Sequence, residues 1–162
     1  MFELTRGNLL EADVEAVVNA VNTEGVMGKG IALQFRNAYP DNYDAYRQAC
    51  EANDVKPGRM FVFLRQSLAS PRYIINFPTK RHWKAKSRME DIESGLIALV
   101  SDVRRLGIRS IAVPALGCGL GGLSWPEVQR HMRDAFEQLP EVRWLVYEPA
   151  GAPDAKGRNR SY

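Results

Sequence analysis

Two glycine-rich segments of this chain have the composition of anion-binding loops. The first, NAVNTEGVMGKGIA, covers residues 19–32, and the second, PALGCGLGGL, covers residues 114–123. Each leads from an expected strand into an expected helix, where free backbone N–H groups and the helix dipole favour an anion. Two such loops at the carboxyl ends of two strands indicate that both hold one diphosphate. For the first loop alone, a simple turn is an equally good interpretation.

The second loop also matches a dinucleotide-binding pattern, because Gly117, Gly119 and Gly122 are spaced as G-x-G-x-x-G. That pattern belongs in the first strand-to-helix turn of a dinucleotide fold, whereas only one expected strand follows it here. A truncated dinucleotide-binding domain is therefore a weak alternative. In the first loop, the amide groups of Asn19 and Asn22 are placed to reach ligand hydroxyls or to hold the loop.

A basic run between the two loops supplies a candidate for chemistry. The chain has 22 Lys and Arg against 19 Asp and Glu, yet residues 80–88, KRHWKAKSR, hold five cations and no acid. Such a local excess suits a polyanionic partner. Lys80 opens the run just past an expected strand, and a partly desolvated lysine can act as a nucleophile or as a proton donor. Without the two loops, Lys80 would be one more surface lysine.

The residues after Lys80 mix cations with aromatic rings. Arg81, His82, Trp83 and Lys84 follow one another, an arrangement suited to single-stranded nucleic acid. Cations follow the phosphates while each base stacked on an aromatic ring contributes about 1–3 kcal/mol. A solvated loop whose Trp83 packs against the domain is an equally good interpretation. Cys118 has no histidine visibly placed to activate it, so we interpret it as a packing residue.

Short strands alternate with amphipathic helices along the chain. Strands are expected at residues 2–5, 14–18, 60–64, 73–77, 109–113 and 142–147. Helices are expected at 29–39 and 40–53, and two more should begin with the capping-box pairs Ser87/Glu90 and Ser124/Glu127. Gly107 should end the third helix. This alternation predicts an α/β fold with three layers, α/β/α, around a largely parallel sheet.

Length and composition limit the remaining possibilities. A chain of 162 residues with 45% hydrophobic residues fits one domain, here 1–149, followed by an expected flexible tail at 150–162. No apolar run is long enough for a membrane span, and no signal-peptide pattern is present. Two cysteines and two histidines show no metal-ligand spacing. We expect a cytoplasmic, reduced, monomeric protein without a metal or cofactor.

The two loops together resemble those of the macrodomains, a family of ADP-ribose-binding modules. The similarity runs from RGNLLEADVEAVVNAVNTEGVMGKGIA through PALGCGLGGL and covers residues 1–149. It implies a mixed, six-stranded sheet between helices, with ADP-ribose in a cleft at the strand ends. Carried over by position, the implied ADP-ribose-binding residues are Asn8, Leu9, Ala20, Val21, Asn22, Gly30, Ile31, Thr79, Gly117, Cys118, Gly119, Leu120, Gly121 and Tyr147.

The segment INFPTKRHW, residues 75–83, resembles a lysine-dependent branch of this family. That branch includes DNA ADP-ribosyl glycohydrolase antitoxins and a protein-directed glycohydrolase, and it implies that Lys80 is catalytic. The protein-directed relatives pair the lysine with an aspartate where this chain has Gly121. The resemblance thus implies removal of ADP-ribose from DNA, from thymine in single strands, against a DNA ADP-ribosyltransferase toxin. Hydrolysis of ADP-ribose from proteins or of O-acetyl-ADP-ribose, and non-catalytic ADP-ribose binding, remain open alternatives.

Overall fold

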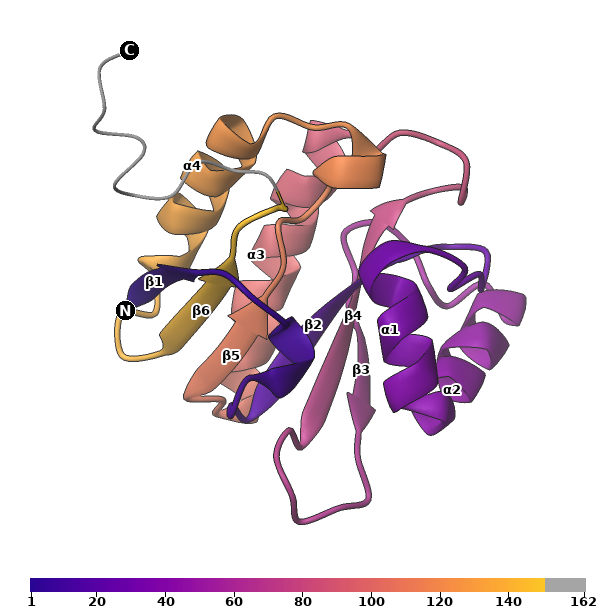
Figure 1. The fold of residues 1–162 in the computed structure, drawn as a ribbon, viewed down its shortest axis with the longest axis horizontal. Helices are drawn as coiled ribbons and strands as arrows, with labels where there is room; N and C mark the ends of the chain where they lie inside the picture. Colours follow the sequence, from indigo (N-terminus) through magenta and orange to yellow (C-terminus); the bar gives the residue numbers. More distant parts are fainter. Residues whose placement is uncertain (151–162) are drawn as a thin grey trace.

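The computed structural model describes residues 1–150, which form one six-stranded sheet with helices on both faces (Figure 1). The strand order is β1-β6-β5-β2-β4-β3, and only the β3–β4 pair is antiparallel. The strands are β1 (Phe2–Thr5), β2 (Ala16–Asn22), β3 (Phe61–Leu64), β4 (Tyr73–Lys80), β5 (Ser110–Val113) and β6 (Arg143–Tyr147). The predicted α/β fold with a mixed sheet is confirmed.

Successive side chains of the central strands point to opposite faces of the sheet and pack against the helices on each face. The helices are α1 (Gly30–Ala38), α2 (Pro40–Glu51), α3 (Met89–Leu106) and α4 (Trp125–Phe136), with short 3-10 turns η1 (Leu9–Glu11) and η2 (Gly119–Gly121). In β2, Ala16 and Val18 pack in the core cluster under α3 and α4. Val17 and Val21 point the other way, into the clusters under η1, α1 and α2. The period of two along the strand thus builds all three layers.

Strand and helix ends differ from the sequence-based expectation in physically explicable ways. β2 begins later and ends later than predicted, at Ala16–Asn22, and β4 continues to Lys80 because its last residues still pair with β2. The capping box predicted at Ser87 is wrong, because Arg88 is the N-cap of α3. Ser124 is the N-cap of α4 as predicted, but its side chain makes no capping bond. Gly107 does end α3, in the left-handed conformation with φ 67°.

This topology brings the first and second glycine-rich loops to one edge of the sheet. β2, β4 and β5 lie side by side and run parallel, so the segments that follow all three strands emerge together. None of the helices in residues 1–150 has the length and apolar character needed to cross a membrane. The tail predicted to be flexible begins at residue 150 and otherwise lies outside the described residues.

Candidate functional site: a cleft between two glycine-rich loops

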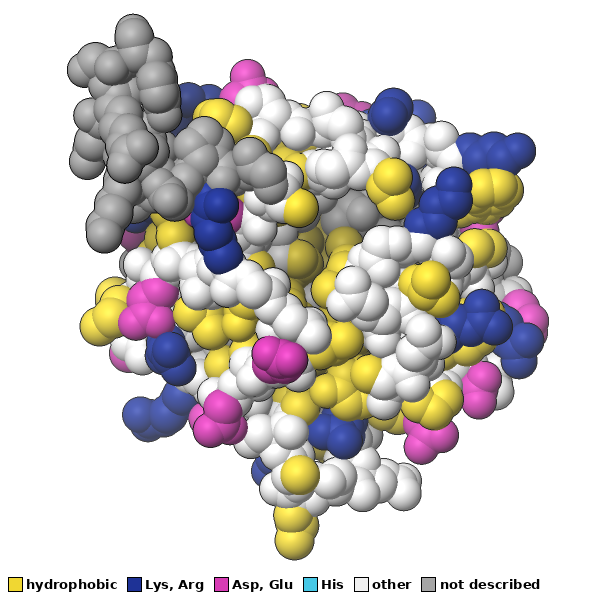
Figure 2. Space-filling model, in the orientation of Figure 1, with side chains coloured by type: hydrophobic (Ala, Val, Ile, Leu, Met, Phe, Trp, Pro, Cys, Tyr) yellow, Lys and Arg dark blue, Asp and Glu magenta, His cyan; other side chains and the backbone are white. Residues whose placement is uncertain are grey.

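A cavity of about 720 Å³ opens where these segments meet, on the hollowed face of Figure 2. Its wall includes Lys80 and Trp83 as well as both glycine-rich loops. All the positions implied for ADP-ribose lie on it, namely Asn8, Leu9, Ala20, Val21, Asn22, Gly30, Ile31, Thr79, Gly117, Cys118, Gly119, Leu120, Gly121 and Tyr147. Arg81, His82 and Lys84 are not part of the wall.

The first loop is held in shape by Asn22, the last residue of β2. Its Oδ1 accepts hydrogen bonds from the backbone N–H groups of Glu24 at 2.9 Å and Val26 at 3.3 Å. Its Nδ2 donates to the carbonyl oxygen of Val26 at 2.7 Å, and the buried Tyr46 hydroxyl donates to the Asn22 carbonyl at 2.7 Å. Asn22 is therefore the loop-holding residue that the sequence offered as one interpretation. Asn19 instead joins a buried amide network, donating to Asn76 at 3.3 Å.

The first loop ends in a helix N-terminus with unused donors. The first bond of α1 runs from the N–H of Leu33 to the carbonyl of Lys29 at 3.3 Å. The N–H groups of Gly30, Ile31 and Ala32 precede that bond, so they have no partner within the helix. Lys29 makes no side-chain capping bond that would occupy them. All four residues line the cavity, so donors and helix dipole face the same space.

The second loop offers two further backbone donors. It folds on itself through bonds from Gly122 N to Gly119 O at 3.1 Å and from Leu123 N to Gly117 O at 3.0 Å. The N–H groups of Gly119 and Leu120 make no hydrogen bond to the rest of residues 1–150. Gly117 and Gly119 have φ of 74° and 65°, a conformation that other residues rarely adopt. Both loops therefore present backbone N–H groups to one cavity, which suits a diphosphate.

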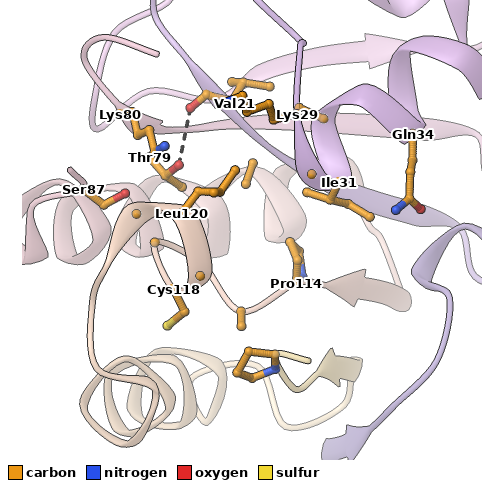
Figure 3. Close-up of a pocket in the computed structure, with 18 of the residues that line it drawn as sticks. Val21, Lys29, Ile31, Gln34, Thr79, Lys80, Ser87, Pro114, Cys118 and Leu120 are labelled. Atoms are coloured by element: carbon orange, nitrogen blue, oxygen red, sulfur yellow. Dashed lines mark hydrogen bonds between the residues drawn. The ribbon is translucent and has the colours of Figure 1, made fainter. Parts of the chain in front are cut away.

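Lys80 lies on the cavity wall because the pairing of β2 with β4 slips by one residue. Val21 pairs with Pro78 but Asn22 pairs with Lys80, leaving Thr79 as the extra residue. The Thr79 hydroxyl donates to the carbonyl of Val21 at 3.4 Å (Figure 3). This bulge places Thr79 and Lys80 together on the wall, as bulges near functional sites commonly redirect side chains.

The environment of Lys80 favours its neutral amine. Partial burial lowers the pKa of Lys80 below its usual value, and the charges of Lys86 and Lys29 lower it further. Desolvation is the larger of the two causes. Lys29 comes from the first loop, which lies far from Lys80 in sequence. A lysine with a lowered pKa is more available as a nucleophile near neutral pH.

The basic segment 80–88 is tied to its surroundings rather than free. Arg81 forms two bonds to the buried carboxylate of Asp91, at 3.0 and 3.1 Å, and its carbonyl accepts from the Thr23 hydroxyl at 2.8 Å. His82 Nε2 lies 3.4 Å from a carboxylate oxygen of Glu24. Arg81 and His82, both predicted to contact DNA, thus hold the segment against α3 and the first loop.

Trp83 is 40% exposed and lines the cavity, so it does not pack into the domain. His82 stacks on its indole with ring centroids 5.8 Å apart. The ammonium of Lys84 lies 4.8 Å from the indole centroid, a cation–π contact. The neighbouring side chains therefore orient Trp83, which stays accessible beside Lys80.

Gly121 meets the basic segment at its far end. The N–H of Ser87 donates to the Gly121 carbonyl at 3.0 Å. A Cβ at Gly121 would lie 2.4 Å from Ser87 Oγ and 3.0 Å from Ser87 Cβ. Ser87 Oγ is buried and has no hydrogen-bond partner among the described residues. Ser87 can lie this close to the second loop only because residue 121 has no side chain. An aspartate at position 121 does not fit unless Ser87 moves.

Some of the other residues of the cavity wall could be predicted from the sequence, and some could not. Burial raises the pKa of the Cys118 thiol to about 11, in agreement with a packing role. Ser87 was missed as a lining residue, because its spacing to Glu90 mimics a capping box. Of the further cavity residues, Val26, Ala32, Pro114 and Ala115 lie within the two glycine-rich loops, whereas Gln34 and Glu148 carry no local signal. Among residues 1–150, no cluster of His, Cys, Asp and Glu is arranged to hold a metal ion.

Comparison with known proteins gives consistent matches. The Macro domain family model matches residues 18–132. A DNA ADP-ribosyl glycohydrolase of Thermus aquaticus is 58% identical over 155 residues, which are 96% of this chain and 43% of that protein. The chain thus spans less than half the length of this curated relative.

Solved structures agree over nearly the whole chain. The macrodomain of Thermus aquaticus DarG is 59% identical, with a TM-score of 0.89 over 92% of this chain and 99% of that one. Thermosipho africanus DarTG in complex with ADP-ribose is 36% identical, with a TM-score of 0.88 over 96% of this chain and 43% of that one. The fold, the paired loops and these matches establish that this chain belongs to the macrodomain family.

Proposed function

We propose that this chain is a DNA ADP-ribosyl glycohydrolase that uses Lys80 to release ADP-ribose from a modified base. The observation that carries the proposal is the position of Lys80, on the wall of the cavity that also receives both glycine-rich loops. The loops would bind the diphosphate, and Asn8, Leu9 and Tyr147 would line the adenosine end. Remote binding of this kind would fix the anomeric carbon of the distal ribose beside Lys80. The name and the high identity of the Thermus aquaticus relative support this activity.

The reaction breaks the bond between the anomeric carbon and the base nitrogen, and water supplies a hydroxyl to the sugar and a proton to the base. In one route, the bond from the anomeric carbon to the ring oxygen breaks as that oxygen takes a proton, and the neutral Lys80 amine adds to the anomeric carbon. The base then leaves with a proton given up by the amine, and a Schiff base remains. The resulting Schiff base then takes up water, which releases ADP-ribose and restores the amine. In a second route, Lys80 positions the water or gives the leaving base its proton. Borohydride would trap a covalent ADP-ribosyl adduct on Lys80 only in the first route.

A DNA substrate is favoured over a protein substrate by Gly121. The resemblance implies that protein-directed relatives place an aspartate there, and Ser87 occupies the space such a side chain needs. Trp83 would stack on the target base or its neighbour. We propose single-stranded DNA with a modified thymine as the substrate and a DNA ADP-ribosyltransferase toxin as the counterpart. A relative from Thermosipho africanus, 38% identical over 161 residues, is named as a fusion of a DNA ADP-ribosyl transferase with a DNA ADP-ribosyl glycohydrolase, which supports that pairing. A cytoplasmic location and a monomeric state remain predictions.

The experiment is to incubate the protein with an oligonucleotide that carries one ADP-ribosylated thymine and to measure released ADP-ribose. We expect release by the wild type, none by Lys80→Ala, and normal release by Lys56→Ala, which removes an exposed lysine outside the cavity. An intact DNA adduct after wild-type treatment would refute the proposed activity. Equal activity of Lys80→Ala would refute only the role of Lys80.

Parallel substrates separate the alternatives. Release from an ADP-ribosylated peptide or from O-acetyl-ADP-ribose, with the DNA adduct untouched, would favour the other hydrolase activities. Tight binding of ADP-ribose with no turnover of any conjugate would favour a non-catalytic ADP-ribose reader.

A further inference from the structure

The cations around the cleft divide into those with acidic partners and those without. Arg81 is held by the Asp91 carboxylate at 3.0 Å, and an Arg88 nitrogen lies 3.8 Å from a Glu90 oxygen. The arginines of the basic segment are therefore already compensated.

Two lysines beside the catalytic candidate have no such partner. Within residues 1–150, no carboxylate lies within 4 Å of Lys29 or Lys86. Both are exposed, and Lys29 forms part of the cavity wall at the start of α1. Lys86 lies along the second loop, where its Cδ and Nζ would be 3.2 and 3.6 Å from a Cβ at Gly122. One lysine thus belongs to each side of the cleft.

The two lysines also act on the same third charge. The charge of each lysine lowers the pKa of Lys80, so each of the two ammonium groups lies within interaction range of Lys80. The positive charges of Lys29 and Lys86 disfavour the protonated form of Lys80, and an anion bound beside them would offset their field. Figure 2 shows Lys and Arg side chains gathered along the upper right of the hollow. The arrangement therefore suits a ligand with negative charges outside the cavity as well as within it.

We infer that Lys29 and Lys86 bind backbone phosphates of the DNA strand on the two sides of the modified nucleotide. This inference rests on the proposed function and identifies the contacts that select a strand over a free nucleoside. The modified base is linked to the ribose carbon that lies beside Lys80, and its nucleotide has a backbone phosphate on each side. Cations on the two sides of Lys80 would therefore contact those phosphates. Lys29 and Lys86 then replace Arg81 and His82 of the sequence-based DNA-contact set, because those two are engaged with carboxylates.

Phosphate could also come from the diphosphate of ADP-ribose itself, and the test distinguishes the two sources. Lys29→Ala, Lys86→Ala, the double variant and the control Lys56→Ala are built on Lys80→Ala, so that the adduct survives. Binding of an ADP-ribosylated single-stranded oligonucleotide is measured by fluorescence anisotropy over a series of NaCl concentrations. Binding of free ADP-ribose and of ADP-ribosylated thymidine is measured by calorimetry under the same conditions.

We expect the slope of log affinity against log salt for the oligonucleotide to become shallower by about 0.7 for each lysine removed. The affinities for free ADP-ribose and for the nucleoside should stay unchanged in Lys86→Ala and should fall less than the oligonucleotide affinity in Lys29→Ala, which removes a residue of the cavity wall. Lys56→Ala should behave like its parent. An unchanged slope, or an equal loss of affinity for free ADP-ribose, would overturn the inference. Turnover by the chain with Lys80 intact is measured separately, so absence of turnover would refute the proposed function without affecting the binding result.

Discussion

Substitution of Gly121 probes the packing that distinguishes this cleft from one with an aspartate in the second loop. In Gly121→Ala the new Cβ would lie 2.4 Å from Ser87 Oγ and 3.0 Å from Ser87 Cβ, so one of the two segments must shift. Forcing an extra methyl into a packed site costs about 1–3 kcal/mol. Gly121 does not have a positive φ, so this cost is steric rather than conformational. Gly121→Asp should cost at least as much.

The assay is a double-mutant cycle with Ser87→Gly, which removes both clashing atoms. Ser87 Oγ has no hydrogen-bond partner, so this substitution breaks no side-chain bond among the described residues. Urea unfolding of the four proteins gives the coupling free energy, which should be about 1–3 kcal/mol and favourable in the double variant. ADP-ribose affinity, measured alongside, should fall in Gly121→Ala and recover in Gly121→Ala/Ser87→Gly.

A matched control separates clash from backbone strain. Gly107 has a φ of 67°, and a Cβ there would meet no atom within 4 Å. Gly107→Ala should therefore destabilise the chain through conformation alone, and Ser87→Gly should not rescue it. Wild-type stability of Gly121→Ala, or a double variant no more stable than Gly121→Ala alone, would refute the packing argument.

Three further outcomes follow from contacts on or near the cleft. Gly95→Ala would place a Cβ 2.3 Å from Phe77 Cζ, so it should lower the free energy of unfolding by about 1–3 kcal/mol in urea titrations despite its better helix propensity; an unchanged midpoint would contradict this. Arg81→Ala leaves the buried Asp91 carboxylate unpaired, so calorimetry should show a lower Tm that Asp91→Asn partly restores; equal Tm values for Arg81→Ala and the wild type would count against the pairing. Because burial lowers the pKa of Lys80, its neutral fraction rises at a lower pH than for an exposed lysine. If the neutral amine is the nucleophile, the initial rate should rise with pH through the lowered pKa of Lys80. A rate that falls over the same pH range would indicate that Lys80 donates a proton.

The sequence predicts the architecture well because the core is locally encoded. The nearly continuous apolar run of β2, which is buried on both faces of the sheet, and the glycine that ends α3 are visible in the sequence and have their expected roles. The capping box at Ser87 does not form because of a tertiary contact. Ser87 has the right spacing to Glu90, but its backbone bonds to Gly121 in the second loop, and α3 begins one residue later than the box requires.

The sequence predicts part of the cleft. The features that it does not predict are contacts between segments that are distant in the sequence. The glycine-rich loops and Lys80 are recognisable from composition and spacing, and the structure brings them to one cavity. The ion pair of Arg81 with Asp91 and the proximity of Lys29 to Lys80 depend on how β2, β4 and α3 pack. No local pattern encodes them. A basic run in the sequence therefore predicts a charged segment but not which of its cations are free to bind.

The measurement that tests the central claim most directly is a crystal structure of this chain with ADP-ribose bound. The account predicts the diphosphate on the N–H groups of Gly30, Ile31, Gly119 and Leu120, and the anomeric carbon of the distal ribose about 3–3.5 Å from Lys80 Nζ. A distal ribose directed away from Lys80, or a diphosphate bound outside the two loops, would contradict it.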